Sequence, residues 1–303
     1  MKLGILTAPF PGRDLSDVAA WAASAGFECI EIACWPAGAG EARRYAGTCH
    51  LDVDGLTRGG AQEAAGRLAE RGLAVSGLGY YPNPLHPDAS HREAVQGHLR
   101  KVIAAAGLMG VPVVNTFVGG DRSLHLEDNW ARAQQVFPDL ARLAQDHGVR
   151  LAFENCPMIF SRDEWPAGHN IAYSPKVWRR ILEEWPGVGM NYDPSHLVWQ
   201  MIDQARFVRE FGASMVHVHA KDLQVDGDGL YDNGILSLGM GWQVPRMPGL
   251  GEVDWAGLFS GLTRAGYDGP IVIEHEDRAF EGSDDKVRRG FLLARDVLRP
   301  YVK

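Results

Sequence analysis

The stretch AGYDGPIVIEHED, residues 265–277, shows the pattern that decides the fold. Gly266 closes a helical segment, the chain then enters the short apolar run 271–273, and the run ends at the carboxylate of Glu274. Glycine is favoured just after a helix because it adopts the left-handed conformation at little steric cost. The stretch therefore predicts a helix, a buried strand, and a polar side chain where that strand ends.

The same punctuation recurs along the chain. Glycines of this kind stand at Gly26, Gly72, Gly110, Gly148 and Gly266. Eight strand-sized runs alternate with helical patterns, at residues 2–7, 28–34, 73–81, 111–119, 150–156, 187–195, 214–222 and 269–277. No Gly-x-Gly-x-x-Gly motif follows the first run, which disfavours a dinucleotide-binding open sheet. We therefore predict an α/β protein, a (β/α)8 TIM barrel formed by a single domain over residues 1–303.

Local signals predict where helices begin and where the chain departs from regularity. Asp14, Asp254 and Ser283 are expected N-caps of three helices. Pro138 lies in the helical pattern after the fourth run and predicts a kink or two helical pieces. The connections at residues 35–56 and 223–253 are long, and loops of that length are usually functional or disordered.

Composition limits the classes of function. Hydrophobic residues make up 46% of the 303 residues, enough for a full core. The formal net charge of −8 argues against nucleic-acid binding, which needs clustered Lys and Arg, and favours a small-molecule substrate. No signal peptide and no run of 18 apolar residues is present, so we expect no membrane partner. Four cysteines without CxxC spacing, Cys29, Cys34, Cys49 and Cys156, are expected to be reduced thiols of a cytoplasmic protein.

Side chains of metal-ligand type end four successive runs: Glu154, Asp193, His219 and Glu274. TIM-barrel active sites lie at the carboxyl ends of the strands. A carboxylate such as Glu154 in an apolar run needs a partner, because an isolated buried charge is costly. His217 and His219 share one face of their run, and His219 is nearer its end. Pairing with Arg or a backbone amide can explain any one of these residues, but it explains four together less well, so we predict that they bind one divalent cation.

Three carboxylates and one imidazole make an oxygen-rich site. Such a donor set suits Mn²⁺ best, with Mg²⁺, Co²⁺ or Zn²⁺ as alternatives. Open coordination positions would receive substrate oxygens.

Four segments resemble those of the xylose isomerase-like TIM-barrel superfamily, which includes ketose 3-epimerases, inosose isomerases and dehydratases, and endonuclease IV. They are FEN (153–155), YDPSH (192–196), HVHAKD (217–222) and IVIEHED (271–277). The resemblance covers nearly the whole chain, and the motifs are specific as a set. It implies that the four residues named above hold the metal and that His196 contacts the substrate. The connection 223–253 is longer than the epimerases usually carry, so their substrate contacts there are not transferred.

The resemblance implies an isomerase or epimerase of a sugar or keto-sugar that transfers protons through a metal-bound enediolate. Glu154 and Glu274, on opposite sides of the substrate, would remove and return the proton. The same intermediate permits elimination, so a lyase or dehydratase of a keto-glycoside or inosose is the alternative. An abasic-site endonuclease is a distant alternative: it needs further ligands, for which His50, His86 and His91 are available. A non-catalytic sugar-binding module is the remaining class.

Further side chains are candidates for substrate contacts. On the segment 223–253, Arg246 can bind a hydroxyl or phosphate and Trp242 can stack on a sugar ring, although packing of the segment explains both equally well. Lys221 follows the histidine pair and can polarise a substrate oxygen, whereas Glu31 is expected to have a structural hydrogen-bonding role. We expect residues 223–253 to close over the substrate. Assembly into a homo-oligomer stays open.

Overall fold

The computed structural model describes residues 1–38, 46–158, 168–235 and 241–302, where eight parallel strands close into a barrel. Their order around the barrel is β1-β10-β7-β6-β5-β4-β3-β2, and β1 pairs with β10 to complete the ring. The strands are β1 (Lys2–Leu6), β2 (Cys29–Ala33), β3 (Ala74–Gly79), β4 (Val113–Thr116), β5 (Arg150–Glu154), β6 (Gly189–Tyr192), β7 (Met215–Ala220) and β10 (Pro270–Ile273). The predicted (β/α)8 TIM barrel is confirmed.

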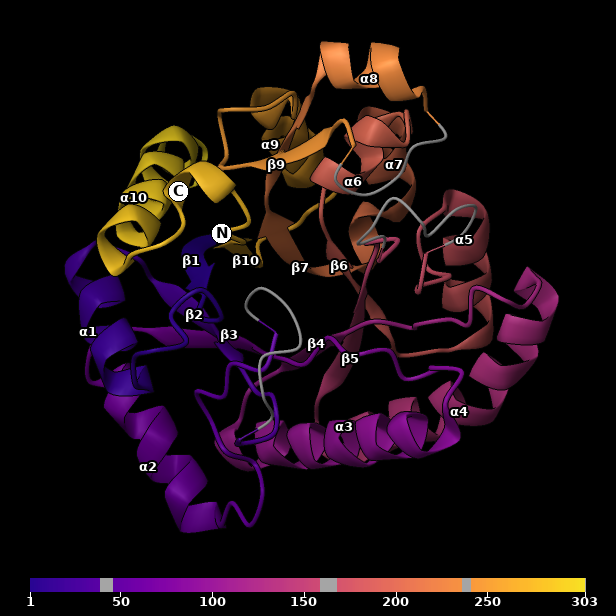
Figure 1. The fold of residues 1–303 in the computed structure, drawn as a ribbon. Helices are drawn as coiled ribbons and strands as arrows, with labels where there is room; N and C mark the ends of the chain where they lie inside the picture. The colour runs from indigo at the N-terminus through magenta and orange to yellow at the C-terminus, as the bar shows by residue number, and fades with distance from the viewer. Residues whose placement is uncertain (39–45, 159–167, 236–240, 303) are drawn as a thin grey trace.

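Helices surround this barrel (Figure 1). They are α1 (Leu15–Ser24), α2 (Arg58–Ala69), α3 (Ala89–Met109), α4 (Leu126–Asp146), α5 (Pro175–Glu184), α6 (Ser195–Trp199), α7 (Gln204–Phe211), α8 (Gly227–Asn233), α9 (Trp255–Arg264) and α10 (Asp284–Leu298). Short 3₁₀ turns occupy residues 212–214, 278–280 and 299–301. Within the described part of the chain, no helix has the length and apolar character needed to span a membrane.

The expected helix-to-strand turns are present. The backbone is left-handed at each predicted position, with φ of 79°, 75°, 70°, 68° and 76° at Gly26, Gly72, Gly110, Gly148 and Gly266 respectively. A residue with a Cβ is strained at such angles, which explains why glycine stands there. These turns lead each helix directly into the next strand.

The predicted caps are also present. Asp14 accepts a hydrogen bond from the amide of Asp17, and Asp254 and Ser283 cap α9 and α10 in the same way. Helix α4 runs without a break through Pro138, so the helix is not divided into two pieces there. Its buried apolar face, which packs on the barrel, outweighs the local cost of proline.

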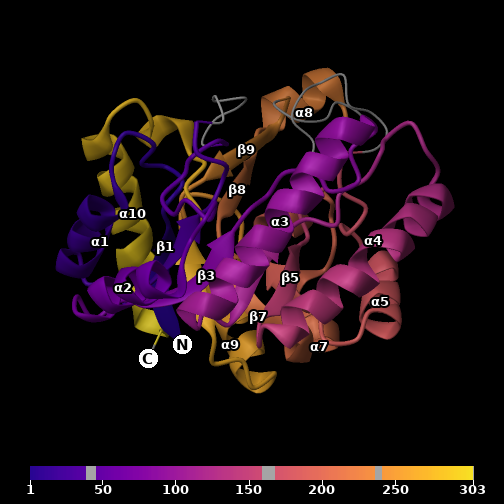
Figure 2. The same ribbon diagram turned by 90° about the horizontal axis from the view of Figure 1, so that it is seen from below.

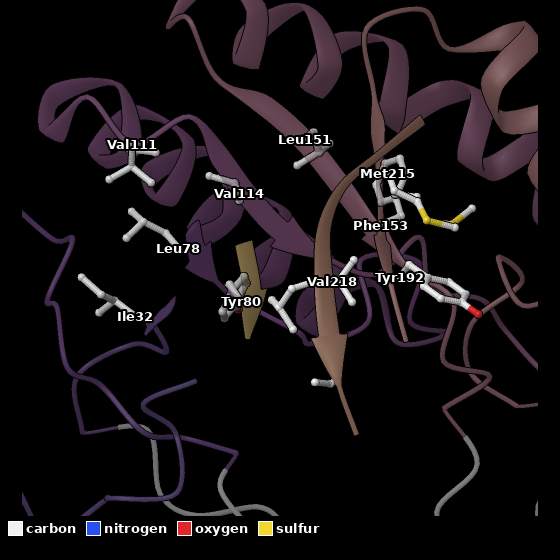
Figure 3. Close-up of a cluster of buried hydrophobic side chains, with 14 of the residues drawn as sticks. Ile32, Leu78, Tyr80, Val111, Val114, Leu151, Phe153, Tyr192, Met215 and Val218 are labelled. Carbon is white, nitrogen blue, oxygen red and sulfur yellow. The ribbon is translucent and has the colours of Figure 1, made fainter. Parts of the chain in front are cut away.

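The barrel strands present two different faces. Outward side chains such as Phe153 and Val218 belong to the large apolar layer between strands and helices, part of which is drawn in Figure 3. Alternation along β7 then places His217 and His219 inside the barrel. On the side of β1, β2 and β10, inward side chains form a small apolar cluster of Leu6, Ala8, Cys29, Ala33 and Val272. The interior therefore has an apolar side beside the polar side chains that β7 contributes.

An antiparallel pair of strands follows β7. Strand β8 (Asp222–Val225) pairs with β9 (Gln243–Arg246), and α8 lies between them in sequence. Figure 2 shows this pair and α8 at the end of the barrel opposite the chain termini, which is the carboxyl end of the strands. The long connection predicted at 223–253 thus contains regular structure, although residues 236–240 lie outside the described part.

The β8–β9 pair is fastened to the barrel by the carboxylate of Asp222. This buried side chain accepts hydrogen bonds from the backbone amides of Leu223, Gly249 and Val253 at 2.9 Å each, and from the indole of Trp255 at 3.0 Å. Four donors directed at one carboxylate satisfy its charge without a cation. The segment after β7 is therefore anchored at both of its ends.

Candidate metal centre

The four predicted ligands lie at the carboxyl ends of four barrel strands that adjoin one another. Glu154 is the last residue of β5, Asp193 follows β6, His219 is near the end of β7, and Glu274 follows β10. The first three are almost fully buried, whereas the Glu274 side chain is 15% exposed. The sequence prediction that these side chains share one end of the barrel agrees with this placement.

Three of them converge around the imidazole of His219. Its Nδ1 lies 3.4 Å from Oε2 of Glu154 and 3.3 Å from Oε2 of Glu274. The ligand atoms of this trio all lie within 4.8 Å of one another, a spacing suited to one ion. The trio therefore offers two oxygens and one nitrogen to a common point.

Asp193 joins the trio through Lys221. The ammonium of Lys221 lies 2.9 Å from Oδ2 of Asp193 and 2.8 Å from Oε2 of Glu274, and 3.1 Å from Oε2 of Glu276. Lys221 is itself 3% exposed, so its charge is held inside the site. In this structure the predicted fourth ligand thus faces the other three across a buried ammonium group.

The loop after β6 fixes the position of Asp193. The amide side chain of Asn155 accepts from the backbone amide of Asp193 at 2.7 Å and donates to its carbonyl at 2.8 Å. The amide of Ser195 donates to Oδ1 at 2.8 Å. Burial alone would raise the pKa of Asp193, but Lys221 and His196 together outweigh burial and hold that pKa well below its usual range. Asp193 is therefore a carboxylate with Oδ2 turned towards the site.

The second nitrogen of His219 is bound by Glu31. Oε2 of this fully buried carboxylate lies 2.7 Å from Nε2 of His219, and the hydroxyl of Tyr81 donates to the other oxygen. In a neutral ring, a carboxylate that accepts from one nitrogen leaves the lone pair on the other, as is common behind metal-binding histidines. Glu31 therefore has the structural role expected of it. Its contact with Nε2 directs Nδ1 of His219 towards Glu154 and Glu274.

His217 lies two residues before His219 on β7, further from the carboxyl end of the strand. Its Nδ1 lies 2.9 Å from Oδ1 of Asn191, and its Nε2 lies 3.2 Å from the hydroxyl of Ser76. Burial lowers the pKa of His217 to about 4. Although Glu31, His217 and His219 are close enough to hold an ion, these hydrogen bonds already occupy both nitrogens of His217.

The chemistry of the donor set fits a divalent cation. Nδ1 of His219 is buried and makes no hydrogen bond of good geometry to a described residue, yet two carboxylate oxygens face it. Burial opposes a charge on this ring, but the carboxylates of Glu31 and Glu274 hold the pKa of His219 well above its usual value. The site therefore attracts positive charge. Carboxylates with one imidazole suit Mn²⁺ or Mg²⁺.

The two other residues predicted near the strand ends also lie at the site. Nε2 of His196 is 3.0 Å from Oδ2 of Asp193 and 3.5 Å from Oε1 of Glu154. Lys221 faces the carboxylates of Asp193 and Glu274. Contact of either residue with a substrate stays a prediction.

The two candidates on the segment after β7 are placed differently. Trp242 is 4% exposed, which favours the packing role weighed as the alternative, and its contact with a sugar stays a prediction. Arg246 is 26% exposed and lies 3.4 Å from Oδ1 of Asp277, whose other oxygen accepts from the amide of Met247. Arg246 therefore remains partly accessible while being tied to the loop after β10.

Sequence reasoning did not single out Tyr81, which donates to Glu31, or Cys156, whose Sγ lies within 4.8 Å of ligand atoms of Glu154 and His196. The sequence held a signal for each. Tyr81 ends the third predicted run, and Cys156 lies two residues after Glu154, where the alternation of side chains places both on one face. The histidines considered for extra metal ligands, His50, His86 and His91, are absent from the metal-compatible groups found in the described ranges. His50, for example, lies within hydrogen-bonding distance of Thr7 and of backbone carbonyls.

The sequence pattern of the xylose isomerase-like TIM barrel family matches residues 19–297. The chain belongs to this family. It is 26% identical to the uncharacterised protein YfiH of Bacillus subtilis (strain 168), over 91% of this chain and 93% of that protein. It is 22% identical to an inosose dehydratase of Lacticaseibacillus casei, over 61% of each chain.

A solved structure shares the fold over its whole length. D-psicose 3-epimerase from Clostridium cellulolyticum H10, solved with D-tagatose, superposes with a TM-score of 0.71 at 16% identity, and each chain is covered completely. At that identity the likeness establishes the fold alone. Proteins similar to this chain in sequence or fold thus include one named as a dehydratase and one named as an epimerase.

Proposed function

We propose that this protein is a divalent-metal-dependent isomerase or epimerase of a sugar or keto-sugar, with Mn²⁺ as the preferred ion. The observation that carries the proposal is the convergence of Glu154, His219 and Glu274 at the carboxyl end of the barrel, with Asp193 adjoining them. Membership of the xylose isomerase-like family and likeness to a D-psicose 3-epimerase support it.

The cation would be held by Glu154, Asp193, His219 and Glu274. When bound, it supplies Lewis acidity that makes a carbon-bound proton beside a carbonyl easier to remove. For Asp193 to hold the cation, the Lys221 ammonium would have to leave Oδ2 of Asp193, and Glu276, 3.1 Å away, would remain its partner. The fit therefore requires a movement of one side chain.

Glu154 and Glu274 are the proposed proton-transferring groups. Glu154 ends β5 and Glu274 follows β10, and Oε2 of each faces Nδ1 of His219. One carboxylate would take a proton from one face of the substrate and the other would return a proton to the opposite face. Lys221, 2.8 Å from Glu274, would donate a hydrogen bond to a substrate oxygen, and His196 would contact the substrate beside Asp193.

Elimination is the second candidate. A lyase or dehydratase would use the same proton removal, followed by departure of a group from the neighbouring carbon. Similarity to an inosose dehydratase supports elimination as the second candidate. The two reactions differ in product, because elimination changes the composition of the sugar and epimerisation changes only its stereochemistry.

Metal analysis and a substrate panel together test the proposal. Purified protein should bind about one Mn²⁺ per chain, and His219→Ala should lose most of it, whereas His91→Ala, which removes an exposed histidine from α3, should not. The loaded protein is then incubated with keto-sugars, and isomers and eliminated products are separated. Equal metal binding by both variants, or a loaded protein that changes no keto-sugar in the panel, would refute the proposal.

A further inference from the structure

The proposed function makes no use of Cys156, which lies at the edge of the site. It follows Glu154 by two residues, is unbridged and half-buried, and its sulfur accepts a hydrogen bond from the amide of Met158 at 3.3 Å. Its Sγ, a carboxylate oxygen of Glu154 and a ring nitrogen of His196 all lie within 4.8 Å of one another. A thiol, an imidazole and a carboxylate are thus gathered at one point.

The imidazole of His196 gives an independent reason to expect a ligand here. His196 is 9% exposed, and both of its ring nitrogens are buried without a hydrogen bond of good geometry to a described residue. A buried nitrogen without a hydrogen bond carries a penalty in the free energy of folding. A ligand bound by the ring nitrogen that lies near Glu154 and Cys156 would remove that penalty there.

We propose that Glu154, Cys156 and His196 form a second cation site, selective for thiophilic ions such as Zn²⁺ or Cd²⁺. Sulfur and imidazole donors favour these ions, whereas the neighbouring cluster around His219 offers mainly oxygen and favours Mn²⁺ or Mg²⁺. Three protein ligands leave the fourth position of a tetrahedral ion for water. Binding joins the ion to Sγ and releases the thiol proton to solvent, with no change in oxidation state.

Glu154 stands between the two clusters. Its Oε2 is 3.4 Å from Nδ1 of His219, and its Oε1 is 3.5 Å from Nε2 of His196. A thiophilic ion that draws this carboxylate towards Cys156 removes a base from the proposed reaction. Inhibition by such ions, unlike their binding, therefore rests on the proposed function.

Titration of the full-length protein with Cd²⁺ tests the site directly, because cadmium thiolates absorb in the ultraviolet by charge transfer from sulfur to metal. Wild-type protein saturated with Mn²⁺ should develop this band with one equivalent of Cd²⁺. Cys156→Ser should lose the band and bind Cd²⁺ about 10- to 100-fold more weakly, and His196→Gln should also weaken binding. If Cys156→Ser does not fold, His196→Gln carries the same test.

Two matched variants separate this site from the rest of the molecule. Cys49→Ser, which removes another half-buried thiol, should keep the band, and so should His219→Ala, which disrupts the candidate Mn²⁺ centre. A band that survives Cys156→Ser, disappears in Cys49→Ser, or never forms would overturn the proposed site. If the band behaves as expected while no keto-sugar turns over, the thiophilic site stands and the proposed function fails.

Discussion

Oε2 of Glu31 lies 2.7 Å from Nε2 of His219, although the two residues come from strands that are not neighbours in the barrel. The contact determines which ring nitrogen faces Glu154 and Glu274. Tyr81 donates to the second oxygen of Glu31, so the carboxylate is held on both sides. The geometry of the candidate centre thus depends on Glu31, which is not one of the four candidate ligands.

We predict that Glu31→Gln weakens Mn²⁺ binding by about 10- to 100-fold, because a neutral amide orients and polarises the imidazole less well than a carboxylate. Calorimetric titration with Mn²⁺ measures the change. Glu63→Gln, on the exposed face of α2, is the control and should bind as wild type does. Unchanged affinity in Glu31→Gln would mean that His219 is oriented by other contacts.

Lys221 supplies the second prediction. Its ammonium neutralises Asp193 and Glu274 in the interior, and removing one partner of a buried ion pair typically costs about 3–5 kcal/mol. Lys221→Met should therefore unfold more easily in EDTA, and Mn²⁺ should restore more stability to it than to wild type. Urea unfolding with and without Mn²⁺ measures both effects.

Lys101→Met is the matched control for this experiment. Lys101 pairs with Asp54 at the surface, with its side chain 55% exposed, so the loss should be within about 1 kcal/mol. If the two lysine variants lose the same stability, or if Mn²⁺ protects them equally, the buried ammonium does not have the stabilising role assigned to it.

The third prediction concerns pH. Burial holds the pKa of His217 at about 4 in the folded protein, compared with 6.5 for a histidine exposed to water. As pH falls from 6.5 to 4, the unfolded chain takes up a proton that the folded chain does not, so stability is lost over this window and is intact above it. His217→Gln should lose less stability over the same window in metal-free buffer. Parallel curves for the variant, wild type and the surface control His91→Gln would contradict this prediction.

Asp222 gives the fourth prediction. In Asp222→Asn an amide group replaces one acceptor oxygen, so some of the four donors lose their partner, at about 1–3 kcal/mol for each. Since these donors anchor the segment that contains β8 and β9, turnover should fall together with stability. Asp228→Asn, in the first turn of α8, removes a charge without these bonds and should change neither. Full activity in Asp222→Asn would show that the anchored segment does not contribute to the site.

The sequence was sufficient for the barrel because each signal that specifies it is local. A left-handed glycine such as Gly266, a cap such as Asp254 and an apolar run each act within a few residues, and their repetition specifies the topology. Of the kink or two helical pieces expected at Pro138, the division into two pieces did not occur, because burial of a helix face is a tertiary effect that local propensity does not report.

Placement of the candidate ligands was predictable for a similar reason, since strand ends in a TIM barrel meet at one edge. The contacts between side chains were not. The bridge made by Lys221 and the support given by Glu31 depend on distances across the closed barrel, which sequence spacing does not encode. The burial of Trp242 depends on how the segment carrying β8 and β9 packs, and the sequence showed only that this segment was long.

Solvent exchange at carbon tests the proposed chemistry most directly. Mn²⁺-loaded protein is incubated with a keto-sugar in D₂O, and the products are examined by NMR and mass spectrometry. We predict deuterium at the inverted carbon for an epimerase, or at the carbon next to the carbonyl after elimination, with rates reduced about 10²- to 10⁴-fold in Glu154→Gln and Glu274→Gln. Absence of deuterium from every keto-sugar tested, together with cleavage of abasic DNA by the same preparation, would contradict metal-assisted proton transfer as the function of this protein.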